Sequence, residues 1–276
     1  MKLLFSEGRP DYGNYVFPYG IWAFPEPGET PTDLFAAGFL PSSHQLDRFY
    51  LCRHLRVQLD RFTASSENRR ILRKGQELTA TLVPRTEFEF TAARREFCLQ
   101  YANSRFGGGM KPERLDSLLS SPVTSHVLVF TVAATGAEVG LVTLHLEAGR
   151  MAFYYYAFYD LAYANPSLGM FMMTSAVTLL ATQGCPLLYL GTCYATNALY
   201  KTQFAGVEFF NGVRWSDNLE ELKQLLQRQQ QPELTEHLLE NAEYREKFLP
   251  GPLPELAAQS VFRAGGGSSA QPASCS

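Results

Sequence analysis

The sequence lacks paired cysteines. Its five cysteines are scattered, with no two of them separated by only two residues, and they are Cys52, Cys98, Cys185, Cys193 and Cys275. This spacing indicates neither a disulfide framework nor a zinc ribbon. The five histidines are also too far apart in sequence to form a local metal-binding motif. We therefore expect reduced, mostly buried thiols and no metal ion.

Long apolar runs are missing as well. No stretch of about 18 apolar residues occurs, and the N-terminal residues turn polar too early for the apolar part of a signal peptide. The chain has 276 residues, of which 46% are hydrophobic and 18% charged, and this composition is typical of a folded globular protein. We expect a cytoplasmic monomer without membrane contact. The formal net charge of −3 argues against a general polyanion binder, although it allows a local basic face.

Proline, glycine and aromatic residues crowd the first sixty positions and predict an irregular, β-rich start. We expect an N-terminal domain over residues 1–85, with a strand over 47–59. Ser65 or Ser66 is a suitable N-cap for a short basic helix over 67–74.

Residues 86–250 predict a second, mixed α/β domain. Apolar side chains at helical intervals favour helices over 86–101 and 111–119. Three β-rich segments over 126–160 then predict an antiparallel meander. The elements expected after it are an apolar helix over 168–182, a strand over 186–191, a helix from about 197 and a strand over 207–213.

The order of these elements indicates an α/β (α+β) fold with a mixed, largely antiparallel sheet flanked by helices. Two amphipathic helices are expected over 217–231 and 233–248. A C-terminal extension over 251–276 follows, and its low-complexity sequence predicts disorder from about residue 264.

Four short motifs follow one another in the middle of the second domain. In chain order they are Phe158-Tyr159-Asp160, Ser167-Leu168-Gly169, Tyr189-Leu190-Gly191, and Tyr200-Lys201 with Phe204. In this order they resemble the C-terminal domain of the arginyl-tRNA–protein transferases and their bacterial leucyl relatives. Upstream, Arg105 with the run Gly107-Gly108-Gly109 and Met110 is similar to the family's basic residue and glycine-rich segment, and residues 65–74 are similar to its double-arginine stretch.

This resemblance covers residues 17–226 and implies a GNAT-like acyltransferase core. It also implies an activity, the transfer of Arg or Leu from an aminoacyl-tRNA to the N-terminal α-amine of an acceptor protein that begins with Asp or Glu. The chain departs from the family at the N-terminal cysteines, which hold an iron–sulfur cluster in many members. Only Cys52 remains, and because a cluster needs about four ligands we expect neither a cluster nor another cofactor. The segment Thr196-Asn197-Ala198-Leu199 also replaces a family Cys and Arg.

The resemblance assigns roles to the motif residues. Attack of an α-amine on an activated ester depends mostly on positioning, and Tyr159 with Asp160 is placed at that amine as the catalytic pair. A core position for Tyr159 and a turn cap for Asp160 are the structural alternatives. Tyr200 and Lys201 are assigned to a phosphate or the terminal adenosine, and Arg105 to the acidic side chain of the acceptor. The remaining substrate-binding positions are Gly108, Ser167, Leu168, Gly169, Tyr189 and Gly191, of which those at the helix start would present backbone amides to an oxygen.

A basic segment is the best candidate for contact with tRNA. Between residues 48 and 74 there are eight Arg or Lys residues and two acidic ones. The predicted tRNA-binding side chains are Arg56, Arg69, Arg70, Arg73 and Lys74. A solvated basic face without a partner is the alternative.

Two other functions remain open. The first is an acyl-CoA-dependent N-acetyltransferase, although the helix start at 165–170 has one glycine and no leading Arg or Gln for a pyrophosphate. The second is a non-catalytic member of the fold that binds tRNA or a protein.

Overall fold

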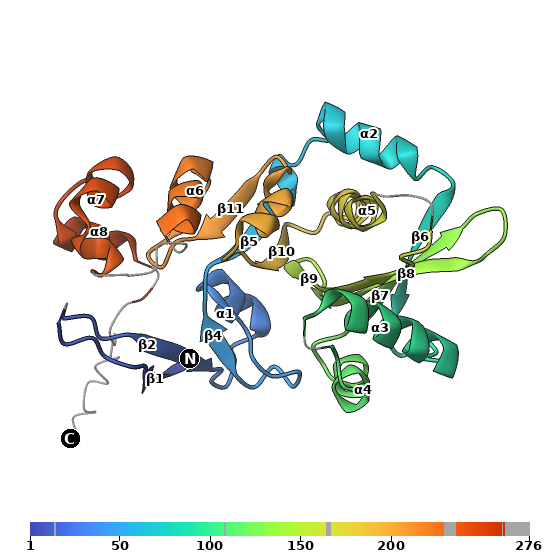
Figure 1. Cartoon of the computed structure of the whole chain (residues 1–276), viewed down its shortest axis with the longest axis horizontal. Helices are drawn as coiled ribbons and strands as arrows, with labels where there is room; N and C mark the ends of the chain where they lie inside the picture. Colours follow the sequence, from blue (N-terminus) through green and yellow to red (C-terminus); the bar gives the residue numbers. More distant parts are fainter. Residues whose placement is uncertain (14, 108, 164–166, 229–235, 261, 263–276) are drawn as a thin grey trace, which may run out of the picture.

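The computed structural model describes residues 1–13, 15–107, 109–163, 167–228, 236–260 and 262. Two sheets organise this part of the chain (Figure 1). The smaller sheet is antiparallel, with the strand order β1-β2-β4-β3. Its strands are β1 (Lys2–Glu7), β2 (Tyr19–Phe24), β3 (Phe39–Pro41) and β4 (Phe49–Leu51), and helix α1 (Pro31–Ala36) joins β2 to β3.

The larger sheet has eight strands in the order β12-β11-β5-β10-β9-β8-β7-β6. All neighbours pair antiparallel except β9 and β10, which are parallel. The strands are β5 (His54–Gln58), β6 (Leu78–Pro84), β7 (His126–Val132), β8 (Glu138–Glu147), β9 (Met151–Tyr159), β10 (Leu187–Thr192), β11 (Val207–Phe210) and β12 (Trp215–Ser216). The sheet is an antiparallel meander that continues through one parallel pair, so the expected mixed, largely antiparallel sheet is confirmed.

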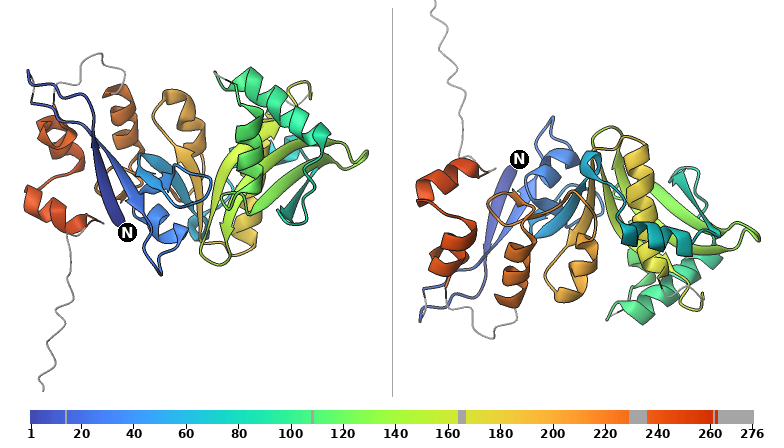
Figure 2. Two further views of the ribbon diagram at one scale, coloured as in Figure 1. Left: turned by 90° about the horizontal axis from the view of Figure 1, so that it is seen from below. Right: turned by 90° about the horizontal axis from the view of Figure 1, so that it is seen from above.

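Helices cover both faces of this sheet (Figures 1 and 2). Helices α3 (Ala92–Arg105) and α4 (Pro112–Ser120) lie on one face, and α2 (Ser66–Lys74) and α5 (Leu168–Thr182) lie on the other. The remaining helices are the 3₁₀ turns η1 (Leu59–Arg61), η2 (Thr196–Thr202) and η3 (Leu238–Glu240), with α6 (Leu219–Arg228), α7 (Ala242–Phe248) and α8 (Leu253–Gln259). None of the described helices is long and apolar enough to cross a bilayer.

Local sequence explains the best-predicted elements. Helix α5 has the expected bounds because it is apolar on all sides and is buried in the main core. Ser65 caps α2 through a 3.1 Å bond from the Asn68 amide, and Asn68 Oδ1 accepts from the Ser65 amide. After α2, Gly75 meets the Phe171 ring of α5, since a Cβ on Gly75 would stand only 2.4 Å from that ring. These features dock α2 onto α5.

Several expectations about the elements need correction. The strand expected over 47–59 is two strands, β4 and β5, which belong to different sheets. Helix α3 begins at Ala92 instead of residue 86, because Thr91 accepts a hydrogen bond from the Arg94 amide and caps it there. In place of one helix over 233–248 the described residues form η3 and α7, and residues 229–235 and the tail from 264 lie outside the described part.

The boundary between the two sheets also differs from the boundary expected at residue 85. Strands β5 and β6 come from the first 85 residues but belong to the larger sheet, so the smaller sheet is complete by Leu51. Strand β5 lies between β10 and β11, which belong to the second half of the chain. The N-terminal segment is therefore part of the larger sheet.

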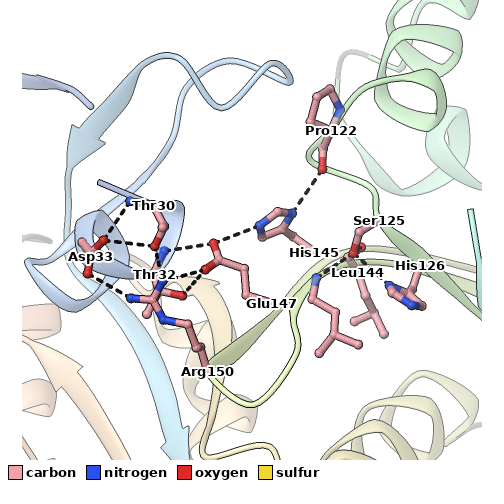
Figure 3. Close-up of polar contacts among 11 residues, drawn as sticks. Thr30, Thr32, Asp33, Pro122, Ser125, His126, Leu144, His145, Glu147 and Arg150 are labelled. Atoms are coloured by element: carbon pink, nitrogen blue, oxygen red, sulfur yellow. Dashed lines mark hydrogen bonds and ion pairs between the residues drawn. The ribbon is translucent and has the colours of Figure 1, made fainter. Parts of the chain in front are cut away.

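Polar contacts tie α1 to the turn between β8 and β9 (Figure 3). Thr32 donates to the Glu147 carboxylate through its amide at 3.1 Å and its hydroxyl at 2.7 Å. Arg150 donates to the Thr30 hydroxyl at 2.6 Å and to Asp33 at 3.1 Å. These bonds fix the smaller sheet against the larger one.

Candidate functional site

The parallel strands β9 and β10 separate soon after they begin to pair. Their register contains only two pairs, Leu188 with Ala152 and Tyr189 with Phe153. Beyond these pairs each strand has a β-bulge. In β9 the extra residue is Tyr155, because Leu144 of β8 pairs with Tyr154 and Thr143 pairs with Tyr156. In β10 the extra residue is Leu190, which precedes Gly191 at a φ of +79°. Bulges bend strands, and here they open the sheet.

A pocket of about 470 Å³ occupies this opening and extends to the smaller sheet. Its size is in the range of small-ligand sites. Its walls are formed by Trp22, Leu40, Pro41, Ser42, Tyr50, Arg114, Phe153, Tyr155, Tyr156, Leu190, Gly191, Thr192 and Lys201. Tyr155 and Tyr156 both face it because of the bulge, with ring centroids 4.6 Å apart.

The charged groups that line this splay pocket are all cationic. They are Arg114 of α4 and Lys201 of η2, and no carboxylate is among the lining residues. Within the described ranges Arg114 makes no ion pair, and its guanidinium contacts the Tyr156 hydroxyl at 3.5 Å. Burial raises the pKa of Tyr50 to about 12, so that hydroxyl stays a neutral donor. Aromatic walls with unpaired cations suit a ligand that has planar and anionic groups.

Lys201 stands at the edge of the splay pocket. Its amine donates to the Thr192 carbonyl oxygen at 3.2 Å and lies 3.8 Å from the position that a Cβ on Gly191 would take. Burial lowers the pKa of Lys201. Lys201 and Thr192 also line a second pocket of about 340 Å³, whose other walls are Tyr194, Ala195, Asn197, Ala198 and Tyr200. The lysine therefore borders both pockets.

Tyr159 and Asp160 lie past the splay pocket, at the far end of β9. The Tyr159 ring lies 4.6 Å from the Tyr101 ring of α3. It also packs against the start of α5, where a Cβ on Gly169 would stand 3.0 Å from it. The Asp160 carboxylate accepts from the Ala162 amide at 2.8 Å and caps its own turn. Neither predicted catalytic residue lines either pocket.

The other predicted substrate-binding residues are divided between pockets and core. Gly191, Lys201 and Tyr200 line one or both pockets. Leu168 is buried in the main core, and Tyr189 is fully buried against Phe35 at a centroid distance of 4.8 Å. With their side chains in the core, Leu168 and Tyr189 remain predicted substrate-binding positions that offer a substrate only their backbone groups.

Four predicted positions remain. Ser167 is the N-cap residue of α5, and Gly169 lies in the first turn of that helix against the Tyr159 ring. Arg105 is exposed at the end of α3, where its charge lowers the pKa of Tyr101 while burial raises it more strongly. Gly108 lies outside the described residues.

The predicted tRNA-binding residues fall in two places. Arg69, Arg70, Arg73 and Lys74 are exposed on α2, which lies across the larger sheet from α4 (Figure 2). Arg70 is paired with Glu67 at 2.5 Å. Arg56 is elsewhere, in β5, where it is mostly buried, bonded to Glu208 at 2.8 Å and 3.9 Å from the Trp215 ring centroid. Arg56 thus has a mostly buried partner, whereas the pair of Arg70 with Glu67 on α2 is exposed.

Sequence reasoning missed the side chains that build most of the splay pocket. Trp22, Tyr50 and Arg114 come from three distant segments, and nothing local marks them as neighbours. The run Phe153-Tyr154-Tyr155-Tyr156 was a usable signal, because four consecutive aromatics in a strand leave some of them outside the core.

Four of the five cysteines lie in the described part of the chain. They are buried and free, as expected, and burial raises the pKa of Cys52 to about 12. Cys275 lies outside the described residues. Among the residues described, no cluster of three His, Cys, Asp or Glu side chains is placed to hold a metal ion.

Comparisons with known proteins give relatives of one kind. An aspartate/glutamate leucyltransferase from Ruegeria pomeroyi is 29% identical over 174 residues, which cover 59% of this chain and 61% of that protein. One from Chromobacterium violaceum is 27% identical over 176 residues, with 61% and 70% covered. The chain thus spans about three fifths of the length of the first of these relatives. No protein-family model matches the chain.

Solved structures with a similar arrangement are more distant. The C-terminal domain of a protein from Agrobacterium fabrum, described as a lysylphosphatidylglycerol synthetase, is 17% identical with a TM-score of 0.40, covering 63% of this chain and 55% of that one. The structure of L-PGS from Bacillus licheniformis is 15% identical with a TM-score of 0.39, covering 55% and 52%.

Proposed function

We propose that this chain, which is related by sequence to the bacterial aspartate/glutamate leucyltransferases, transfers an amino acid from a charged tRNA to the N-terminal α-amine of an acceptor protein. The observation that carries the proposal is the splay pocket, whose lining is aromatic and cationic. The terminal adenosine of a tRNA offers a planar base for stacking and phosphates for the cations. Trp22, Tyr50 and Arg114 are suited to these contacts.

Aminoacyl transfer from tRNA to an α-amine depends mainly on how the protein positions the two substrates. The ester that joins the amino acid to tRNA is already activated, and the α-amine is a competent nucleophile once it is neutral. A pocket that holds the ester in a fixed place beside a second pocket for the acceptor supplies the required proximity. The two pockets that meet at Thr192 and Lys201 have this relationship.

Leucine is the donated residue that the splay pocket favours. A donated arginine would bring a guanidinium, which needs a carboxylate partner when it leaves water. The lining residues include Leu40, Pro41, Phe153 and Leu190 and no acidic side chain. Leucine would be accommodated there by apolar contact.

An acidic first residue on the acceptor is the second specific part of the proposal. Its carboxylate would meet Arg105, the exposed arginine at the end of α3. The body of the tRNA would contact the basic side chains of α2. Tyr159 and Asp160 would then act outside the pockets, at the end of β9.

Transfer by the purified protein tests this function. The protein would be incubated with leucyl-tRNA or arginyl-tRNA and with peptides beginning with Asp, Glu or Ala, and the products would be measured by mass spectrometry. We expect one leucine on the peptides that begin with Asp or Glu. Transfer of arginine alone would reject the donor assignment. Acetyl-CoA consumption with no transfer from either tRNA would show that the enzyme is an acetyltransferase instead.

The variant Arg114→Gln tests whether the splay pocket binds the end of the tRNA. Loss of this cation should raise the KM for aminoacyl-tRNA, because one charged contact is removed from the ligand. Arg95→Gln is the control, since Arg95 is an exposed arginine of α3 that is already paired with Asp116 at 2.7 Å. Equal effects of the two changes would mean that the splay pocket does not hold the tRNA end.

A further inference from the structure

Lys201 is the one charged side chain shared by the two pockets. On one side lies the aromatic splay pocket, and on the other lies the smaller pocket formed by η2 and the residues before it, which we call the η2 pocket. A group at a shared edge touches whatever occupies either pocket. In a transfer between two substrates, the atoms that react must meet at such an edge.

The surroundings of Lys201 leave its amine available for proton transfer. Its amine donates a hydrogen bond to the Thr192 carbonyl oxygen at 3.2 Å, and no ion pair with a carboxylate is found within the described residues. A carboxylate partner would hold the amine in its charged form. A carbonyl oxygen can accept a hydrogen bond from either the charged or the neutral amine, so this bond orients the group without fixing its charge.

Few titratable or charged side chains share the two pockets with Lys201. Arg114 comes from α4, Tyr155 and Tyr156 from β9, and Tyr50 from β4 across the splay pocket. Beside it lie Tyr194 and Tyr200 in the η2 pocket, and the thiol of Cys193 is near enough to oppose slightly the effect of burial on the lysine. None of these groups is an acid that is ionised near pH 7 by its ordinary pKa.

We propose that Lys201 is the proton-transfer residue of the reaction, with the aminoacyl ester held in the splay pocket and the acceptor N-terminus held in the η2 pocket. This assignment rests on the proposed function and adds to it a catalytic residue and a place for each substrate. It moves the catalytic role from Tyr159 and Asp160, which lie past both pockets, to a residue that borders both.

The step balances without any further reactant. The neutral α-amine of the acceptor forms an N–C bond to the ester carbonyl, and the C–O bond to the ribose breaks. Neutral Lys201 takes the proton that the attacking nitrogen must lose and gives it to the ribose oxygen as that oxygen leaves. The products are a new amide and a tRNA with a free hydroxyl, and Lys201 returns to its neutral form.

Variants of Lys201 separate proton transfer from a simple need for positive charge. Lys201→Arg keeps the charge but cannot release a proton near neutral pH, and Lys201→Met keeps the length without charge or proton. Both should lower kcat by a factor of about 10² to 10⁴ while leaving the KM for aminoacyl-tRNA near that of the unchanged protein. Lys223→Met is the control, because Lys223 is exposed on α6.

The pH profile of kcat at saturating acceptor gives a readout that a structural role would not change. The unchanged protein should show a limb that rises with pH, and both variants should lose it. Lys201→Cys followed by aminoethylation rebuilds a lysine analogue whose amine has a lower pKa, because the sulfur withdraws electrons. Activity should return with the limb moved to lower pH. This rescue keeps the test valid if Lys201→Met folds poorly.

The variant Asn197→Trp tests whether the acceptor N-terminus binds in the η2 pocket. Asn197 is exposed in the η2 pocket, and an indole there should raise the KM for the peptide without raising the KM for aminoacyl-tRNA. If the protein transfers an amino acid but Lys201→Arg keeps its kcat and pH profile, Lys201 is not the proton-transfer residue. If the unchanged protein transfers nothing, the proposed function itself fails.

Discussion

The amine of Lys201 lies 3.8 Å from the point where a Cβ on Gly191 would stand, so a methyl group at residue 191 would touch it. Gly191 follows the bulge that separates β10 from β9, and its φ of +79° is a conformation that other residues adopt at a cost. The glycine thus allows the positive φ after the bulge and also leaves space beside the amine of Lys201.

Gly191→Ala should lower both stability and activity. The positive φ should cost about 1–2 kcal/mol of unfolding free energy. A backbone shift that relieves this strain would move the neighbouring Thr192 carbonyl, which accepts from Lys201, and should lower the transfer rate by a factor of about 10 or more. Gly212→Ala is the control, because Gly212 has a φ of +96° but no atom within 4 Å of its added Cβ. Denaturant unfolding and initial rates measure the two effects. Similar activities for the two variants would contradict the idea that Gly191 positions Lys201.

Glu208→Gln should destabilise the chain strongly. Glu208 accepts from Arg56 at 2.8 Å and from Gln58 at 2.5 Å, and both members of the ion pair are mostly buried. Removal of the carboxylate leaves a buried guanidinium without its counter-ion, at a cost of about 3 kcal/mol or more. The unfolding midpoint in urea measures the loss.

Glu67→Gln is the comparison for this change. It breaks the exposed pair with Arg70 and should leave the unfolding midpoint almost unchanged, because solvent screens this pair. Equal costs for the two changes would mean that Arg56 is not held by its partner and remains free to bind a phosphate.

His54 should make stability depend on pH. The ring is completely buried, its Nδ1 lies 2.9 Å from the Cys52 carbonyl oxygen, and burial lowers its pKa from 6.5 to about 4. The unfolded chain therefore binds a proton at His54 below pH 6.5, whereas the folded chain does so only near pH 4. The unfolding free energy should fall by about 3 kcal/mol over this range.

His54→Gln should remove most of this pH dependence, and His237→Gln, at an exposed position, should not. Urea unfolding at several pH values between 4 and 7 measures it. His44 and His126 also have pKa values lowered mainly by burial, so the difference between the two variants is the informative quantity. An unchanged slope in His54→Gln would show that protonation of His54 is not coupled to unfolding.

The basic face of α2 should affect tRNA binding through its salt dependence. Arg69→Gln with Arg73→Gln removes two cations spaced by one helical turn. The slope of log affinity against log salt should become shallower by about one for each lost phosphate contact. Arg95→Gln with Lys247→Gln removes two exposed cations outside α2 and is the control. If both pairs change the slope equally, net charge and not α2 governs the binding.

Sequence alone predicted the elements that depend on their own residues. The helix over 168–182 was predicted with the bounds of α5 because fifteen consecutive residues suit a buried helix. The three strands of the meander were also predicted, since their side chains combine β-branched and aromatic types. By contrast, the strand expected over 47–59 breaks at Cys52 and Arg53 because its two parts pair with different neighbours, and local pattern holds no information on partners.

The candidate site was predicted in part for the same reason. Gly191, Tyr200 and Lys201 follow one strand closely, so a motif could mark them. Trp22 and Arg114 reach the splay pocket only through the packing of the smaller sheet and α4, which no local pattern specifies. Tyr189 stands two residues before Gly191, yet the alternation of the strand places its side chain in the core.

The place of β5 between β10 and β11 limits how this chain can be divided. A chain shortened to begin at residue 86 would lose the strand that joins the two halves of the larger sheet, and with it β6 at the far edge. It would also lose Trp22 and Tyr50 from the splay pocket. The N-terminal residues thus cannot be exchanged between relatives as a separate unit without replacing part of the larger sheet and of the splay pocket.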